Sequence, residues 1–121
     1  MSLDSARLEK IRAWLLLRLR ELSDGVSQGL DELASEGHHL ADLEELAGDV
    51  SAEGVVFEQF RSSADTIGLI EKALERLDEG NYEICEGCEG AIGEERLDAL
   101  PFASQCISCK RKEEEQQSAT L

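Results

Sequence analysis

Four cysteines in the last third of the chain constrain its fold more than any other feature. They form two pairs, Cys85-x2-Cys88 and Cys106-x2-Cys109, with seventeen residues between the pairs. Two thiolates at this spacing can bind one metal ion from a tight turn, and two such turns complete a tetrahedral zinc site. We therefore predict one structural Zn2+ bound by all four cysteines. Because such a site stabilises only a short segment, the residues before it must be stabilised by other interactions.

A site with four protein ligands leaves no open position for water or substrate. No enzyme activity is therefore expected, and a zinc hydrolase or deaminase, which needs an open ligand position, is disfavoured. Free or redox-active cysteines remain the alternative to a metal site. One residue departs from the usual pattern: zinc knuckles often carry Gly directly after the second cysteine, whereas this chain has Glu89 there and Gly90 one residue later.

The composition favours long helices over a sheet. Apolar residues make up 41% of the chain but aromatic residues only 4%, and Pro101 is the one proline, which is typical of helices without a large globular core. The formal net charge of −15 disfavours direct binding to nucleic acid, because phosphate contacts need a Lys/Arg surface. A protein partner with a basic surface is expected instead.

The cellular location can also be predicted from the sequence. No apolar run approaches the roughly 18 residues of a membrane span, and the N-terminus lacks a signal-peptide pattern. We therefore expect a cytoplasmic protein with no membrane partner. In that compartment paired cysteines favour metal binding over disulfides.

Two amphipathic segments precede the cysteines. Residues 5–36 are predicted to form one helix, because their apolar residues recur at steps of three and four. A second stripe with the same steps ends near Gly80, which suits a helix C-terminal cap. The first stripe comprises Leu8, Ile11, Leu15, Leu19, Leu22, Val26, Leu30 and Leu33, and the second comprises Phe60, Ser63, Ile67, Ile70, Leu74 and Leu77.

The start of the second helix is less sharply defined. Asp42 followed by Glu45 resembles a capping box, and a helix that begins there would also place Val50 in the apolar stripe. In the first helix, Gly25 and Gly29 each cost about 1 kcal/mol relative to Ala and could allow a local bend.

Two amphipathic helices joined by a short turn can cover each other's apolar stripes as an antiparallel coiled coil. We predict an all-α fold in which residues 1–80 form a long antiparallel coiled-coil helical hairpin with its tip near residues 38–47. Residues 81–112 form a small four-cysteine zinc-finger globule. Residues 113–121 are a polar C-terminal tail or a short helix.

The segment from residue 70 to residue 110 combines the four cysteines with a set of apolar, glycine, arginine and proline positions. The positions are Leu74, Gly80, Tyr82, Cys85, Cys88, Ile92, Arg96, Leu97, Ala99, Pro101, Cys106 and Cys109. With these residues the segment resembles the DksA/TraR family of bacterial transcription regulators. The resemblance implies a binding mechanism: such proteins bind bacterial RNA polymerase and insert a hairpin tip through its secondary channel to modulate initiation.

The family's tip motif is an Asp, two residues, a second Asp, one residue and Ala. An ungapped count back from Cys85 places Asp42, Glu45 and Ala47 at these positions, so the second acid is Glu rather than Asp. The resemblance implies that these residues approach the catalytic metal region of the polymerase. Asp49 is a competing tip acid if the turn lies later in the chain.

Family members that respond to guanosine tetraphosphate place basic residues at a site shared with polymerase. The same count puts Ser62, Leu69 and Leu100 at several of those positions, and only Lys110 remains as a basic candidate. The resemblance therefore implies a weak or absent response to this nucleotide. A different function also stays open: a zinc-ribbon adaptor that binds another protein through its coiled coil, unrelated to the polymerase active centre.

Overall fold

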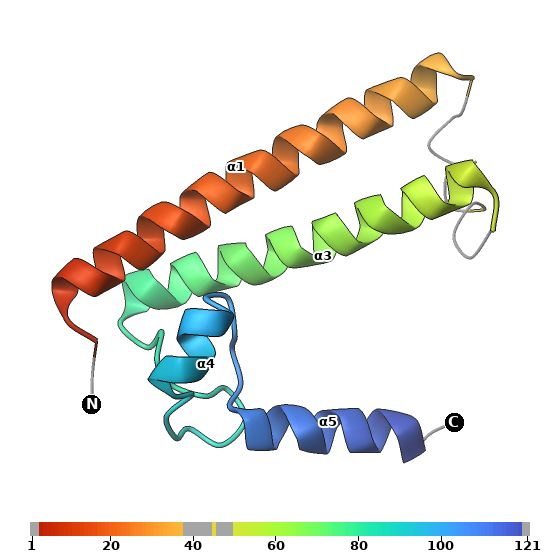
Figure 1. Cartoon of the computed structure of the whole chain (residues 1–121). Helices are drawn as coiled ribbons and strands as arrows, with labels where there is room; N and C mark the ends of the chain where they lie inside the picture. The colour runs from red at the N-terminus through yellow and green to blue at the C-terminus, as the bar shows by residue number, and fades with distance from the viewer. Residues whose placement is uncertain (1–2, 38–44, 46–49, 120–121) are drawn as a thin grey trace. The chain divides into compact units, whose positions relative to one another are not determined.

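A computed structural model of the chain describes residues 3–37, 45 and 50–119 (Figure 1). The described residues contain no strand, and their one ladder-like contact is an isolated antiparallel bridge between Ile84 and Ala91. The predicted all-α class is therefore confirmed. The helices are α1 (Ser5–Ser35), α3 (Ala52–Glu79), α4 (Glu94–Ala99) and α5 (Ile107–Ala119). None of these described helices combines the length and hydropathy needed to cross a membrane.

The chain divides into two compact units. Unit 1 comprises Met1–Leu15 and Leu69–Leu121, and unit 2 comprises Leu16–Gly68. Both long helices contribute to both units, and all four cysteines lie in unit 1.

The apolar stripe of α1 is covered, as its period requires. Leu15 and Leu33 are only 0% and 4% exposed. The remaining stripe residues are half-buried. Trp14 and Leu16, the neighbours of Leu15 along the chain, are 43% and 50% exposed. The helix therefore buries one face and leaves the other in solvent.

Helix α3 ends as the sequence predicts. Gly80 has a φ of 82°, a left-handed conformation that Gly adopts without a steric cost. The backbone N–H of Asn81 then donates to the carbonyl of Arg76 at 3.0 Å, which is the hydrogen bond of a Schellman cap.

The start of α3 differs from one expectation. The helix begins at Ala52, and the Ser51 hydroxyl accepts a hydrogen bond from the backbone N–H of Gly54 at 3.2 Å, so Ser51 is the N-cap. Val50 precedes this cap and is 95% exposed. The placement of Val50 in the apolar stripe was therefore wrong, because the residue lies before the helix rather than in it.

Within unit 2 the two long helices run antiparallel. The ring of Phe60 from α3 lies directly against Gly29 of α1. Further along α1, Leu33 and Glu36 line a cavity of about 200 Å3 together with Val56 and Ala52, which lie earlier in α3. Later residues of α1 therefore meet earlier residues of α3, and the predicted antiparallel helical hairpin is confirmed.

Unit 1 attaches the start of α1 to the segment that carries the cysteines. The backbone N–H of Leu3 donates to the carboxylate of Glu83 at 2.9 Å. Arg7 forms ion pairs with Glu94 and Asp98 of α4. Such exposed ion pairs contribute little stability, so they orient these segments more than they stabilise them.

The contact between Gly29 and Phe60 predicts different effects for two similar substitutions. We expect Gly25→Ala to raise the free energy of unfolding by about 1 kcal/mol, because Ala is the better helix former and nothing lies within 4 Å of the added methyl group. A methyl group at Gly29 would lie 1.9 Å from Cζ of Phe60. Gly29→Ala should therefore be about 1–3 kcal/mol less stable than Gly25→Ala.

Urea unfolding followed by circular dichroism measures this difference. Equal stability of the two variants would show that the close contact at Gly29 does not constrain the helix pair.

Candidate metal centre

The four cysteines occupy two separate turns of unit 1. Cys85 and Cys88 lie in the loop between α3 and α4, whereas Cys106 directly precedes α5 and Cys109 lies in its first turn. The carbonyl of Cys106 accepts from the backbone N–H of Lys110 at 3.0 Å, so the second pair is held by the start of a helix.

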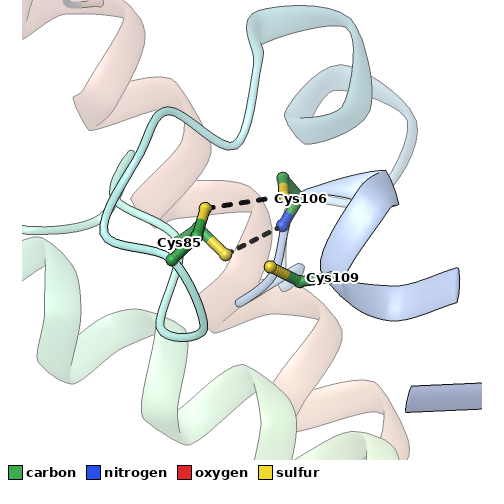
Figure 2. A group of neighbouring side chains, drawn as sticks. Cys85, Cys106 and Cys109 are labelled. Atoms are coloured by element: carbon green, nitrogen blue, oxygen red, sulfur yellow. Dashed lines mark hydrogen bonds between the residues drawn. The ribbon is translucent and has the colours of Figure 1, made fainter. Parts of the chain in front are cut away.

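The sulfur atoms of the two turns converge on one point. All four Sγ atoms lie within 4.8 Å of one another, and those of Cys88 and Cys106 are 3.9 Å apart. Figure 2 shows the side chain of Cys85 facing Cys106 and Cys109. A tetrahedral zinc ion with Zn–S bonds of about 2.3 Å requires sulfur atoms about 3.8 Å apart. The donor set and its dimensions therefore fit one zinc ion.

Hydrogen bonds prepare Cys85 to be an anionic ligand. Its Sγ accepts from the backbone N–H groups of Cys106 at 3.2 Å and Gly87 at 3.3 Å. The backbone N–H of Cys106, followed by that of Cys88, lowers the pKa of Cys85 to about 6, against the smaller opposing effect of burial. These backbone donors therefore favour the thiolate of Cys85, the form that binds metal.

The thiol of Cys109 is harder to ionise in the absence of a cation. Neighbouring thiols, that of Cys106 first and that of Cys85 next, raise the pKa of Cys109 to about 12. Anions this close repel one another, so four thiolates can coexist only around a positive charge. A dication at the centre would remove this barrier and release protons on binding.

The first turn has little space for side chains. A Cβ added at Gly87 would lie 3.0 Å from the Cys109 sulfur, so the close approach of the two turns favours glycine here. The backbone N–H of Cys85 donates to the carbonyl of Gly90 at 2.7 Å and closes the turn.

The backbone at Glu89, directly after Cys88, shows how a glutamate is accommodated where zinc knuckles often carry glycine. Glu89 has a φ of 62°, the left-handed conformation that favours glycine, and its backbone N–H donates to the carbonyl of Cys85 at 2.9 Å. The backbone thus adopts the geometry that a knuckle glycine would supply, with a glutamate in its place. We expect this conformation to be strained.

The predicted tip residues can be placed only in part. Glu45 is exposed. Asp42, Ala47 and the competing acid Asp49 lie outside the described residues.

Two residues that help to shape the cysteine site, Gly87 and Arg76, were not predicted from the sequence, because the cysteine spacing does not point to them. Gly87 is one of the two residues between Cys85 and Cys88, where the CxxC pattern allows any residue. Only its closeness to Cys109 in the structure shows that it matters for the site. Arg76 is 5% exposed although it is charged, and it lies in the last turn of α3. In the sequence, Arg76 is marked only by its position next to the apolar Leu77. Many exposed charged residues also have an apolar neighbour, so this position does not predict that Arg76 is buried.

Comparison with known proteins identifies the cysteine segment. Residues 80–115 match the model of the prokaryotic dksA/traR C4-type zinc finger. Over 108 residues the chain is 28% identical to the RNA polymerase-binding transcription factor DksA of Escherichia coli K12, an alignment that covers 89% of this chain and 72% of that protein.

Solved structures show the same fold. The structure of transcription factor DksA2 from Pseudomonas aeruginosa matches with a TM-score of 0.71 and 28% identity, covering 95% of this chain and 88% of that chain. The structure of the RNA polymerase binding protein and transcriptional regulator Dks from Chlamydia trachomatis matches with a TM-score of 0.61 and 18% identity over 96% of both chains, which supports the fold alone.

The C4-type match and the converging sulfurs confirm the prediction of one structural zinc ion. The four-cysteine zinc-finger globule of the predicted fold is confirmed with it. Four sulfur ligands complete a tetrahedron, so a zinc ion held there has no free position for a substrate.

The left-handed conformation of Glu89 leads to a stability prediction. Glu89→Gly should raise the free energy of unfolding of the zinc-bound protein by about 1 kcal/mol, because glycine adopts this φ without strain. Guanidinium unfolding in the presence of zinc measures the change.

Glu86→Gly is the matched control in the same turn, since Glu86 does not have a positive φ. This control should be destabilised by roughly 0.5–1 kcal/mol through the added chain entropy. A Glu89→Gly variant that is destabilised to the same extent would contradict the assignment of strain to this residue.

Proposed function

Because the chain belongs to the DksA/TraR zinc-finger family, we propose that it is a transcription regulator that binds bacterial RNA polymerase. The observation that carries this proposal is the match of 89% of the chain, hairpin as well as finger, to a transcription factor named as RNA polymerase-binding. As a polymerase-binding factor it would act in the cytoplasm.

We further propose that the hairpin tip acts through the secondary channel of the polymerase. Its candidate residues are Asp42, Glu45 and Ala47. Glu45 is exposed, as a residue that contacts a partner must be. Two long helices, α1 with 31 residues and α3 with 28, give the hairpin the reach to present such a tip. The acids would alter promoter-complex stability through their charge near the catalytic metal.

In this proposal the zinc finger supports the hairpin and performs no chemistry. Its metal site is closed by four cysteines, and unit 1 joins the finger to the base of both long helices. We therefore propose that the protein has no catalytic activity of its own and acts by altering the polymerase.

The charge distribution supports a protein partner over nucleic acid. The net charge is −15, and several arginines are already paired with acids. Nη2 of Arg12 lies 2.7 Å from Oδ1 of Asp78, and Nη1 of Arg18 lies 3.3 Å from Oε2 of Glu21. The guanidinium of Arg7 forms ion pairs with two carboxylates. We propose that DNA and RNA are not bound directly, because the large excess of acidic residues repels a phosphate backbone.

Neutral isosteres at the tip test the proposed mechanism. Asp42→Asn and Glu45→Gln should leave polymerase binding intact and abolish the effect on promoter-complex lifetime, because the charge is lost while the shape is kept. Substitution of exposed Glu45 should change the free energy of unfolding by less than about 0.5 kcal/mol. Binding to purified polymerase and open-complex decay measure the two properties.

Exposed Glu58 of α3 provides a control, since Glu58→Gln removes one charge from the hairpin away from the tip. Full activity in the tip variants would exclude the proposed role of these acids. Failure of the wild-type protein to compete with another secondary-channel factor would favour the alternative, an adaptor that binds a different protein through its helices.

The response to guanosine tetraphosphate is proposed to be weak or absent. Ser62 is exposed, and Leu69 and Leu100 are each 40% exposed. Three of the positions at which responsive family members carry basic residues therefore present uncharged side chains to solvent. Nζ of Lys110 lies 3.9 Å from the carboxylate of Glu113, which partly offsets its charge.

We expect the affinity of the nucleotide for purified polymerase to be unchanged when this protein is added. Leu69→Lys together with Leu100→Arg should create a measurable gain if these positions face the nucleotide. A large gain with the wild-type protein would contradict the prediction.

A further inference from the structure

Arg76 is the one buried charged residue in the described part of the chain. Its side chain leaves the last turn of α3 and is only 5% exposed. Its Nη2 atom donates two hydrogen bonds, to the carbonyl of Tyr82 at 2.8 Å and to the carbonyl of Ala103 at 2.9 Å. Hydrogen bonds from a charged donor are stronger than those between neutral groups.

The two acceptors occupy equivalent positions in the two cysteine turns. Tyr82 lies three residues before Cys85, and Ala103 lies three residues before Cys106. A single guanidinium nitrogen therefore joins the two backbone segments that lead into the two CxxC pairs. The distance between these segments sets how closely the first cysteine of each pair can approach the other.

Further contacts hold the same two segments. The guanidinium of Arg76 lies over the ring of Tyr82, 5.7 Å from its centre, in a cation–π contact. The Tyr82 hydroxyl donates to the carbonyl of Pro101 at 2.6 Å. Arg96 of α4 donates through Nε to the carbonyl of Gln105, the residue before Cys106, at 2.7 Å.

The turns that these contacts position are bonded directly to each other. The backbone N–H of Glu86 donates to the carbonyl of Ser104 at 2.9 Å, and the backbone N–H of Cys106 donates to the sulfur of Cys85 at 3.2 Å. Both bonds need the two turns in register. A shift of the 101–105 segment would break them and separate the sulfur atoms.

We propose that Arg76 is a positioning residue for the zinc site: it holds the two CxxC turns at the separation that one zinc ion requires. Both of these hydrogen bonds go to backbone carbonyls rather than to sulfur, so Arg76 acts through the carbonyls of Tyr82 and Ala103. The zinc affinity of this chain therefore depends on a residue of the hairpin, so the hairpin base and the finger form one metal-binding unit within unit 1.

Two hydrogen bonds offset part of the cost of burying the charge of Arg76. A buried charge is unfavourable unless it is well bonded, and Nη2 bonds to two carbonyls. Among the described residues, Nε and Nη1 have no hydrogen-bond partner. Because one nitrogen makes both bonds, the ammonium group of a lysine should replace it in part, whereas methionine should replace only its bulk.

Zinc competition against a chromogenic chelator tests the proposal on the full chain. We expect Arg76→Met to weaken zinc affinity by about 10- to 100-fold, the range seen when groups that orient metal ligands are removed. Arg76→Lys should recover part of this loss. Arg61→Met is the matched control, the same substitution at an exposed position of α3, and should bind zinc as the wild type does.

A cobalt spectrum separates positioning from the loss of a ligand. With saturating Co2+, Arg76→Met should keep the ligand-field bands of a four-thiolate site, and far-ultraviolet circular dichroism should show unchanged helix content. Wild-type zinc affinity in Arg76→Met, or equal weakening in Arg61→Met and Arg76→Met, would overturn the proposal. So would an Arg76→Lys variant that is as weak as Arg76→Met.

A milder variant covers the case in which Arg76→Met does not fold. Tyr82→Phe removes only the hydroxyl bond to Pro101, and we expect it to fold and to bind zinc more weakly than the wild type. If Tyr82→Phe and Arg76→Lys both keep wild-type zinc affinity, the proposal is wrong.

Discussion

The zinc finger of unit 1 depends on one metal ion that binds both cysteine turns and so holds them together. Few side chains are buried between residues 81 and 106: Tyr82, Cys85, Ile92, Leu97 and Ala103. So small an apolar core does not hold a loop-rich segment by itself, and metal binding then supplies folding free energy. The backbone responds to this constraint at two positions. Gly87 leaves space for the sulfur of Cys109, and Glu89 adopts a left-handed conformation to close the turn.

The hairpin is held by a different interaction. Its helices bury apolar stripes that repeat every three or four residues, and the ring of Phe60 packs against Gly29. A glycine that weakens the helix by itself therefore permits tight packing of the pair. Arg76 connects the two kinds of order, because it belongs to the stripe-bearing helix α3 and bonds to both segments that lead into the cysteine pairs.

Much of the fold and of the metal site could be predicted from local patterns. The CxxC spacing depends on residues close in sequence, and the stripes of α1 and α3 follow from helix periodicity, so both were accessible without coordinates. The start of α3 was not. Asp42 and Ser51 can both cap a helix, and sequence alone does not say which one does; Ser51 caps α3, and Val50 lies in solvent. The tip acids still depend on the family resemblance.

The sequence by itself determined that four thiolates come in two pairs, that two amphipathic helices precede them, and that the chain carries a strongly negative charge. These are properties of composition and of spacing along the chain. Only the tertiary structure decided why a glutamate can follow Cys88, and that Arg76 is buried against carbonyls 6 and 27 residues away. The physical reason is that such hydrogen bonds join a side chain to backbone carbonyls, and every residue carries a carbonyl, so the sequence does not mark the acceptors.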